Sequence, residues 1–280
     1  MYKLGIIGYP LGHSISAVIQ KAGFESLGLD GSYDILETPP EDLIQRIKFL
    51  KTQGYNGFNV TIPLKVPMSL FLDEIDDYAN IAGCVNTVKI TEDKSFIGYN
   101  TDIYGFKKAL PDNIVLTDKK AAILGTGGAA RAATVGLIEK GVKKIDFYTR
   151  NIINSKQLLD YMRAKFSEVD FGVYQIQNIR SLDEYSIIIN ATPIGMKGFM
   201  ADEMPLEAKD FDNINRDTVI YDIVYNPIET VLIKEARKRD FRIVEGLDML
   251  VFQAQRAIEI WTGQSPDANV MKIAALRALS

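Results

Sequence analysis

The stretch Lys120-Ala-Ala-Ile-Leu-Gly-Thr-Gly-Gly-Ala-Ala130 decides the fold class of this 280-residue chain. Its apolar start predicts a buried strand, and residues 131–140 predict a helix. A glycine turn between a strand and a helix can bind the pyrophosphate of a dinucleotide on the amide groups at the helix N-terminus. Gly125 permits the tight turn, Gly127 lets the backbone approach the pyrophosphate, and Ala130 allows the helix to pack closely on the strand.

Strands and helices alternate on both sides of this turn. Apolar runs predict strands at Lys3–Gly8, Gly57–Thr61, Lys144–Thr149, Ser186–Asn190 and Thr218–Asp222. Residues 85–90 and 96–99 predict a hairpin around residues 91–94. Helical spacing predicts helices over residues 228–239 and 247–261 and from about residue 267 onward, but periodicity does not tell whether the last two return to the first domain. We therefore predict two α/β domains.

A helix start is predicted in the first half of the chain. Thr38-Pro-Pro-Glu41 combines a capping residue, a proline at the first helical position and a glutamate three residues after the cap. Leu43, Ile44, Ile47 and Leu50 then recur at helical spacing. We expect Thr38 to cap this helix and the four apolar side chains to face its buried side.

Composition and charge exclude several classes of function. The formal net charge of −4 argues against a nucleic-acid partner, which requires a basic surplus. Cys84 is the only cysteine, so no internal disulfide can form and a cytoplasmic location is expected. One cysteine and one histidine argue against a zinc site, and we expect no metal. No apolar run approaches the ~20 residues that span a bilayer, and residues 1–8 are typical of a strand and not of a signal peptide, so no membrane partner is expected.

The end of the strand after the glycine turn distinguishes two cofactors. An acidic residue there binds the ribose hydroxyls of NAD, whereas an arginine accommodates the additional phosphate of NADP. The strand ends in Tyr148-Thr149-Arg150-Asn151, without an acid at its tip. Arg150 carries a planar fork suited to phosphate, although a solvated arginine at a strand end is the alternative. After a glycine turn of this kind, the phosphate interpretation is favoured.

Polar residues gather at the ends of several elements in the first domain. Lys65, with Asn59 and Thr61, follows one strand, while Asn86 and Asp102 belong to two further polar clusters. If the strands share a sheet, these clusters can converge on one crevice. Taken singly, Lys65 also fits a surface lysine, Asn86 a turn residue and Asp102 an acid at a helix start.

Two serines flank the start of the first helix, and a histidine precedes them. Ser14 and Ser16 fit helix capping best when taken alone, and binding of a small oxygen-rich ligand is the functional alternative. His13 is the only histidine and invites an acid–base interpretation, yet its turn-forming neighbours favour a structural role in the loop. Cys84 has no base near it in the sequence, which favours a buried inert thiol.

Taken in order along nearly the whole chain, these segments resemble the shikimate dehydrogenase family, and several of them together are far more specific than the glycine turn alone. The resemblance rests on Gly12–Ser16, Asn59–Lys65, Gly83–Thr87, Gly98–Asp102, the glycine turn, Asn190–Met196 and Met249–Gln253.

The resemblance implies a role for each matched residue. Lys65 matches the catalytic lysine and Asp102 its partner. The other positions that hold the substrate carboxylate and hydroxyls are Ser14, Ser16, Thr61, Asn86, Tyr225 and Gln253. The positions that match the cofactor site are Gly125, Thr126, Gly127, Gly128, Ala129, Thr149, Arg150, Asn151, Ile223 and Gly246, with Asp77 in a lesser role.

The resemblance also implies an architecture and an activity. A substrate-binding domain of residues 1–104 plus 247–280 and a Rossmann-type dinucleotide-binding domain of residues 105–246 enclose a cleft. The implied reaction is the reversible reduction of 3-dehydroshikimate to shikimate with NADP(H), in aromatic amino acid biosynthesis. The implied partners are a small-molecule substrate and, as an option, a second copy in a homodimer.

Alternatives within this family stay open. Asp248 stands where the family commonly has glycine, which weakens the assignment of cofactor and paralogue. Relatives that also use quinate often carry threonine where Ser16 stands, so Ser16 favours shikimate. The alternatives are a quinate/shikimate dehydrogenase using NAD, a paralogue from an aminated-shikimate pathway, and a nucleotide sensor without chemistry, against which the retained Lys65 and Asp102 argue.

Overall fold

The fold is described here from a computed structural model that covers residues 1–12, 14–179 and 182–280. His13 lies outside the described residues. The chain forms two compact units: unit 1 comprises Met1–Gly105 and Leu250–Ser280, and unit 2 comprises Phe106–Met249. The chain crosses from one unit to the other inside α4 (Thr101–Ala109) and inside α8 (Gly246–Thr262). Within the described ranges, no helix has the length and apolar character that a membrane crossing requires.

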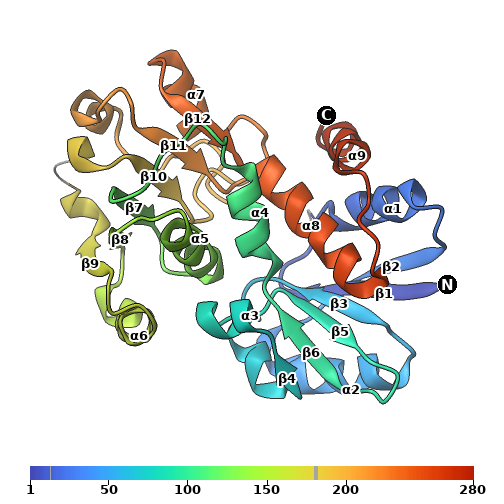
Figure 1. Cartoon of the computed structure of the whole chain (residues 1–280). Coiled ribbons are helices and arrows are strands. Elements are labelled where there is room, and N and C mark those ends of the chain that lie inside the picture. The colour runs from blue at the N-terminus through green and yellow to red at the C-terminus, as the bar shows by residue number, and fades with distance from the viewer. Residues whose placement is uncertain (13, 180–181) are drawn as a thin grey trace. The chain divides into compact units, whose positions relative to one another are not determined.

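Unit 1 is built on a mixed six-stranded sheet. Its strands are β1 (Tyr2–Gly8), β2 (Gly31–Glu37), β3 (Gly57–Val60), β4 (Glu74–Ile75), β5 (Thr87–Ile90) and β6 (Phe96–Tyr99), in the order β2-β1-β3-β5-β6-β4 (Figure 1). β1 pairs in parallel with β2 and β3, while β5 runs antiparallel to β3 and β6. The predicted hairpin is confirmed as β5 and β6, with a turn closed by the Thr91 amide, which donates to the Ser95 carbonyl over 3.0 Å.

Unit 1 also contains helices, of which α1, α2 and α3 connect strands of its sheet. The helices of unit 1 are α1 (Ser16–Ser26), α2 (Leu43–Thr52), α3 (Asp77–Ala82), the first part of α4, most of α8, and α9 (Ala268–Leu279). In α2, Leu43, Ile47 and Leu50 are buried, but Ile44 is 54% exposed. The expected apolar face therefore holds three of the four residues, and the prediction for Ile44 is wrong.

The predicted cap of α2 is also wrong. Pro40–Asp42 form a 3-10 turn before α2, and Pro39 is its N-terminal flanking residue, without a side-chain cap. The hydroxyl of Thr38 instead donates to the Leu36 carbonyl over 2.7 Å and accepts from Nε of Arg46 over 3.0 Å. Two consecutive prolines keep the chain extended after Thr38, which places its side chain out of reach of the first free helical amides.

The last two helices pack in unit 1, which periodicity left open. The indole Nε1 of Trp261 in α8 donates to the Val88 carbonyl of β5 over 2.9 Å. Asp267 caps α9, and α9 lies beside α1 (Figure 1). A Cβ on Gly23 of α1 would lie 2.4 Å from Ile258 and 3.1 Å from Met271, so the missing side chain is what lets α8 and α9 approach α1.

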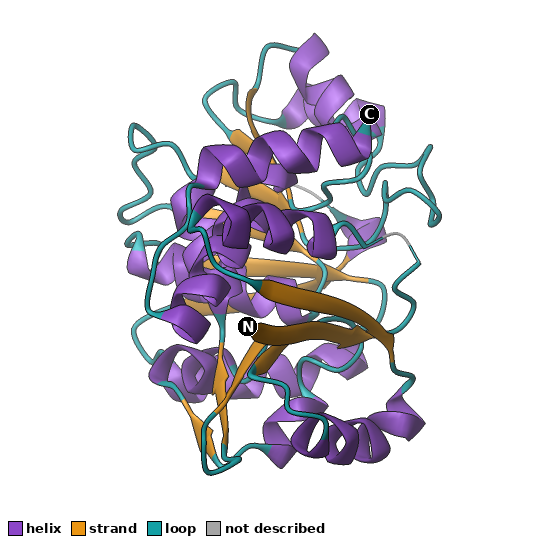
Figure 2. Cartoon of the chain, turned by 90° about the vertical axis from the view of Figure 1, so that its right-hand side faces the viewer, coloured by secondary structure: helices purple, strands orange, loops and turns teal. Residues whose placement is uncertain are grey.

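Unit 2 is a parallel six-stranded sheet with helices between its strands. Figure 2 shows the helices of the chain in purple and its strands in orange. The strand order is β12-β11-β10-β7-β8-β9, so the direction of winding reverses between β7 and β10. The strands are β7 (Lys120–Leu124), β8 (Lys144–Thr149), β9 (Asp170–Gln175), β10 (Ile187–Asn190), β11 (Val219–Asp222) and β12 (Arg242–Glu245). The helices are α5 (Gly128–Glu139), α6 (Ile152–Lys165) and α7 (Val231–Lys238). The predicted Rossmann-type fold is confirmed.

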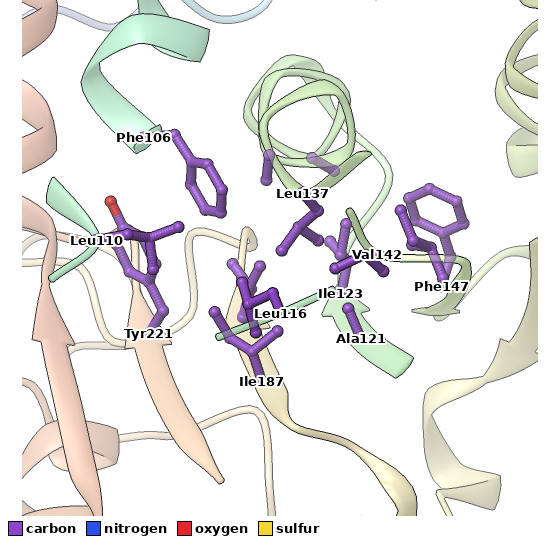
Figure 3. Close-up of a cluster of buried hydrophobic side chains, with 14 of the residues drawn as sticks. Phe106, Leu110, Leu116, Ala121, Ile123, Leu137, Val142, Phe147, Ile187 and Tyr221 are labelled. Atoms are coloured by element: carbon purple, nitrogen blue, oxygen red, sulfur yellow. The ribbon is translucent and has the colours of Figure 1, made fainter. Parts of the chain in front are cut away.

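The core of unit 2 lies between this sheet and α5 (Figure 3). Ala121, Ile123 and Leu137 are fully buried there. The ring of Phe106 stacks on that of Tyr221 with centroids 5.0 Å apart and planes 5° from parallel. The continuous apolar runs of the sequence thus fill a sheet covered on both faces, as parallel strands require.

Candidate active site

Lys65 lies in the loop that follows β3. Its backbone carbonyl accepts a hydrogen bond from the Val85 amide over 2.8 Å, which fixes the loop against the start of β5. The Leu64 amide donates to the Thr61 carbonyl over 2.8 Å and closes the turn between them. β3 ends at Val60, and Pro63 has no amide hydrogen to extend the ladder, so this stretch leaves the sheet and presents Lys65 beside it.

Asp102 is in the first turn of α4, close to Lys65. The Nζ atom of Lys65 donates to Oδ2 of Asp102 over 2.5 Å. The two side chains are 15% and 8% exposed. An ammonium and a carboxylate this close, with little water around them, form a strong charge-assisted hydrogen bond. The predicted meeting of these two residues, 37 positions apart in sequence, is present in unit 1.

Asn86 holds the other oxygen of this carboxylate. Its Nδ2 donates to Oδ1 of Asp102 over 2.7 Å and to the Thr101 hydroxyl over 2.9 Å, and its Oδ1 accepts from the Thr101 amide over 2.7 Å. Because a backbone amide can only donate, this last bond fixes which end of the Asn86 side chain faces Asp102. Asn86 therefore acts inside the protein as a clamp on the carboxylate, in addition to the substrate contact that the resemblance implies.

Gln253 of α8 also joins this polar cluster. Its Oε1 lies 3.4 Å from the Thr101 hydroxyl, and its Nε2 donates to the Leu250 carbonyl over 2.8 Å. Thr61 is half-buried and packs against β1, since a Cβ on Gly8 would lie only 2.4 Å from Cγ2 of Thr61. Gln253 thus takes part in the Lys65–Asp102 cluster, while the orientation of Thr61 depends on Gly8.

Ser14 and Ser16 hydrogen-bond to each other at the start of α1. Their hydroxyls lie 3.1 Å apart, and the Ser16 amide donates to Oγ of Ser14 over 3.3 Å. The N-terminal flanking residue of α1 is Ile15, which makes no side-chain cap. Neither serine therefore occupies the N-cap position that sequence reasoning favoured. Ser14 lies in the loop before the helix, and Ser16 is the first residue of α1.

The glycine turn has the features that a pyrophosphate site requires. Gly125 has φ +105°, and a Cβ there would lie 3.0 Å from the Ala191 carbonyl, so only glycine fits. Gly127 precedes α5, and among the described residues other than Gly127 and its two chain neighbours, no heavy atom lies within 4 Å of the position a Cβ would take there. Ala130 is fully buried. The turn lies after β7 and beside the loop after β10, where the winding of the sheet reverses and ligands bind in such folds.

Thr149 ends β8, and Arg150 and Asn151 follow it, at the same edge of the sheet as the glycine turn because β7 and β8 are parallel. Arg150 and Asn151 are exposed, and the Asn151 amide donates to the Thr149 hydroxyl over 3.3 Å. Arg150 thus follows β8 at the carboxyl edge of the sheet, where a ribose or its phosphate would lie.

Ile223 and Gly246 come together in unit 2. A Cβ on Gly246 would lie 2.3 Å from the Ile223 carbonyl oxygen, so this contact requires glycine. The loop that carries Ile223 is tied to Asp222, whose carboxylate accepts from the Thr230 hydroxyl over 2.6 Å, from Nδ2 of Asn190 over 2.9 Å and from the Val224 amide over 3.0 Å. Sequence reasoning missed Asp222, because it reads there only as the last residue of a strand.

The buried carboxylate of Asp222 should give stability a recognisable pH dependence. Burial raises the pKa of Asp222 from 3.8 to about 6, although its three hydrogen bonds oppose the rise. The folded protein keeps this proton to a higher pH than the unfolded chain, so the free energy of unfolding falls as pH rises from about 4 to about 6. The raised pKa of this one group should lower the free energy of unfolding by about 3 kcal/mol once pH has risen above the folded-state pKa.

The test is urea unfolding of the wild type and Asp222→Asn at several pH values across this window. The difference in unfolding free energy between the two proteins should change with pH there, and Asp217→Asn, which removes an exposed carboxylate, should show no such change. Parallel pH dependences for wild type and Asp222→Asn would contradict the assignment.

The predicted site residues divide between the units. Lys65, Asp102, Asn86 and Gln253 share one hydrogen-bonded cluster of unit 1. Ser14, Ser16, Thr61 and the exposed Asp77 lie elsewhere in unit 1. The remaining cofactor positions lie in unit 2, as does Tyr225, the predicted substrate residue whose pKa is raised by burial.

A parallel sheet with a glycine turn at its switch point, together with a lysine–carboxylate pair in a second α/β unit, is the arrangement of a dehydrogenase that uses a nicotinamide dinucleotide. Two family models match the chain: a shikimate dehydrogenase substrate binding domain over residues 6–88 and a shikimate 5'-dehydrogenase C-terminal domain over residues 246–276. A shikimate dehydrogenase (NADP(+)) of Archaeoglobus fulgidus is 37% identical over 279 residues, which cover 100% of this chain and 99% of that protein. The chain belongs to the shikimate dehydrogenase family.

Solved structures with the same fold agree with this membership. A crystal structure of a shikimate dehydrogenase in complex with NADP+ matches with a TM-score of 0.90 and 38% identity, covering 100% of this chain and 96% of that one. A ligand-free 5-ketofructose reductase of Gluconobacter sp. matches with a TM-score of 0.86 and 31% identity, covering 99% and 98%. The fold thus serves more than one ketone substrate, and the substrate must be argued from the site.

Proposed function

We propose that this chain catalyses the reversible, NADP-dependent reduction of 3-dehydroshikimate to shikimate. The observation that carries the proposal is the contact of 2.5 Å between Lys65 and Asp102, clamped by Asn86. The two family models and the names of the curated relatives supply the substrate and the cofactor. In this proposal unit 1 binds the substrate and unit 2 binds the nucleotide.

The chemistry requires one proton donor at the ketone oxygen. Bound NADPH supplies a hydride to the ketone carbon, and negative charge develops on the oxygen. Lys65, as an ammonium, stabilises that charge and donates a proton to it, because a donor aimed at the developing oxyanion lowers the barrier. Asp102 holds Lys65 in place and accepts a hydrogen bond from the neighbouring substrate hydroxyl. In the reverse direction Lys65 takes the proton back.

The remaining polar groups position the substrate. Ser14 and Ser16 offer hydroxyl donors to its carboxylate, with the hydroxyl of Tyr225. Thr61, Asn86 and Gln253 serve its ring hydroxyls. Several neutral hydrogen-bond donors can bind the substrate carboxylate without placing a second cation near Lys65. Together they fix the orientation of an anionic substrate.

The glycine turn and the tip of β8 bind the nucleotide in this proposal. Gly125–Ala129 bind the pyrophosphate, and Thr149–Asn151 bind the ribose phosphate. Ile223 and Gly246 lie near the nicotinamide. Asp77 has a lesser role in cofactor binding. An exposed arginine without an acid beside it favours NADP over NAD.

The Arg150→Ala variant should separate the two cofactors. Its Kd for NADPH should rise about 10- to 100-fold, since a charge-assisted bidentate contact with phosphate is lost, while the Kd for NADH should change less than about two-fold. Quenching of protein fluorescence measures both constants. The matched control is Arg242→Ala, which removes an exposed arginine from the opposite edge of the same sheet. Equal weakening of both cofactors by Arg150→Ala would show that Arg150 does not recognise the phosphate.

The proposal is tested by an activity matrix. Shikimate, quinate and the alcohol formed from 5-ketofructose are each oxidised with NADP+ and with NAD+, and absorbance of the reduced nicotinamide is recorded. The highest kcat/KM is expected for shikimate with NADP+. A preference for quinate with NAD+ would select the first alternative, and binding of NADPH without turnover of any substrate would select the sensor.

The oligomeric state and the cellular location of the protein stay predictions. A homodimer is an option that sedimentation velocity at micromolar concentration would test, and a cytoplasmic location fits the single buried cysteine, Cys84. The partner in catalysis is a small molecule.

A further inference from the structure

Behind the Lys65–Asp102 pair lies a continuous row of hydrogen bonds. Oδ1 of Asn86 accepts from the Thr87 hydroxyl over 3.1 Å. Nδ2 of Asn59 donates to that same hydroxyl over 3.0 Å and to the Asn86 carbonyl over 3.2 Å. Oδ1 of Asn59 accepts from the Tyr33 hydroxyl over 2.6 Å. The row therefore runs without a break from Tyr33 to the carboxylate of Asp102.

Every hydrogen bond in this row points the same way. The Asn86 carbonyl can only accept, so the Nδ2 end of Asn59 must face it, and Oδ1 of Asn59 must face Tyr33. The Thr101 amide can only donate, so Oδ1 of Asn86 faces it and Nδ2 faces Asp102. The donors are thus aligned head to tail and end on the carboxylate. Aligned hydrogen bonds polarise one another, which strengthens the last bond of the row.

The sheet of unit 1 sets this alignment. Tyr33 stands opposite Leu4 in the pairing of β2 with β1, and Asn59 stands opposite Ile6 in the pairing of β1 with β3, so both point to one face of the sheet. Thr87 stands directly opposite Asn59 in the pairing of β3 with β5. Tyr33 therefore reaches across β1 to Asn59, a contact between residues 26 positions apart that only this strand order permits.

Beyond Tyr33, which is half-buried, the row is enclosed by protein. As whole residues, Asn59, Asn86, Thr87 and Asp102 are each at most 6% exposed. Burial of the Tyr33 hydroxyl raises its pKa well above the ordinary value, so the hydroxyl keeps the proton that it donates. Gln20 offers a second donor to Oδ1 of Asn59, but at 3.4 Å it is the weaker of the two.

We propose that Tyr33 is a positioning residue for the Lys65–Asp102 pair, acting through Asn59, Thr87 and Asn86. The inference rests on the proposed function, because it assigns the pair its task. Tyr33 itself touches neither substrate nor cofactor. By orienting Asn59 it holds the Thr87 hydroxyl toward Asn86, and Asn86 then presents a fixed donor to Asp102. Loss of the row should slow the chemical step and leave binding of the nicotinamide cofactor unchanged.

The test combines two substitutions in one cycle. Tyr33→Phe should lower kcat about 3- to 10-fold, the effect of one net hydrogen bond, with the KM for NADP+ changed less than two-fold. Thr87→Val should lower kcat by at least as much, and Thr87→Ser, which keeps the hydroxyl, should restore it. The double variant Tyr33→Phe/Thr87→Val should be no slower than Thr87→Val alone, because the row is already broken. A merely structural role would make the two effects multiply.

A matched control and a readout without substrate complete the design. Tyr55→Phe removes another tyrosine hydroxyl of unit 1, which donates to Asp34 over 2.7 Å, and should leave kcat unchanged. The Nδ2 proton resonances of Asn86 should move in Tyr33→Phe and Thr87→Val but not in Tyr55→Phe. A kcat of Tyr33→Phe within two-fold of the wild type, multiplying effects, or unmoved Asn86 resonances would each overturn the proposal. Absence of shikimate turnover in the wild type would instead refute the proposed function, and the resonances would still report on the row.

Discussion

Replacing Lys65 by alanine should lower kcat by at least about 10²-fold, which is the low end of the loss expected when a general acid is removed. The physical reason is that the ammonium is the donor placed beside Asp102, so the developing oxyanion loses both its positive charge and its proton source. Kd for NADPH, measured by fluorescence, should change less than two-fold, because the nucleotide is bound by unit 2 in the proposed arrangement.

The control for this experiment is another lysine of unit 1. Lys89 donates to the Ile260 carbonyl over 3.0 Å and takes no part in the contact with Asp102. Lys89→Ala should keep kcat within about three-fold of the wild type. Turnover by Lys65→Ala at a rate close to that of Lys89→Ala would remove Lys65 from the chemistry.

The second large effect is expected for Asp102→Asn. Asn86 presents Nδ2 to this position, so the new amide must turn its oxygen toward Asn86 and its NH2 group toward the ammonium of Lys65. Two donors then face each other where a carboxylate stood, and Lys65 loses its anchor. We expect kcat to fall by about 10²-fold, and the double variant with Lys65→Ala to be no slower than the slower single variant, since residues that act as a unit are not additive.

Thermal denaturation gives an independent reading of Asp102→Asn. In this variant the ammonium of Lys65, whose side chain is only 15% exposed, loses its counter-charge, so Tm should fall. The control for the effect on kcat is Asp34→Asn, which alters a carboxylate that accepts a hydrogen bond from Tyr55. Independent, multiplying losses in the double variant would show that Lys65 and Asp102 do not work as one unit.

Much of the fold follows from local sequence. The strand at Lys120–Leu124, the glycine turn and the strand at Lys144–Thr149 are found where the pattern predicts them, because fully buried parallel strands are continuous apolar runs. The strand at Asp170–Gln175 shows the opposite case. Its glycine at position 172 lowers the strand signal, yet a Cβ there would lie 2.2 Å from Oδ1 of Asp146, so glycine is required by a neighbour that local sequence cannot reveal.

The candidate site also contains residues that the sequence could predict and residues that it could not. Lys65, Asn86 and Asp102 could be predicted as candidates because they follow the ends of strands or begin a helix, and such ends meet at one edge of a sheet. Tyr33 could not, since a tyrosine in a strand satisfies ordinary strand propensity and its hydroxyl partner depends on β1 lying between β2 and β3. Thr38 failed for the converse reason: its local pattern was correct for a cap, but Leu36 and Arg46 bind its hydroxyl.

The bond from the Val85 amide to the Lys65 carbonyl has a bearing on how this family can diversify. Val85 and Asn86 are adjacent residues, and through them one short piece of backbone sets the spacing of Lys65 and Asp102. The hairpin tip at Thr91–Ser95 does not contribute to that spacing. Loop lengthening or shortening at the tip should therefore be neutral for turnover during evolution, while a single-residue deletion at Val85 or Asn86 should abolish it.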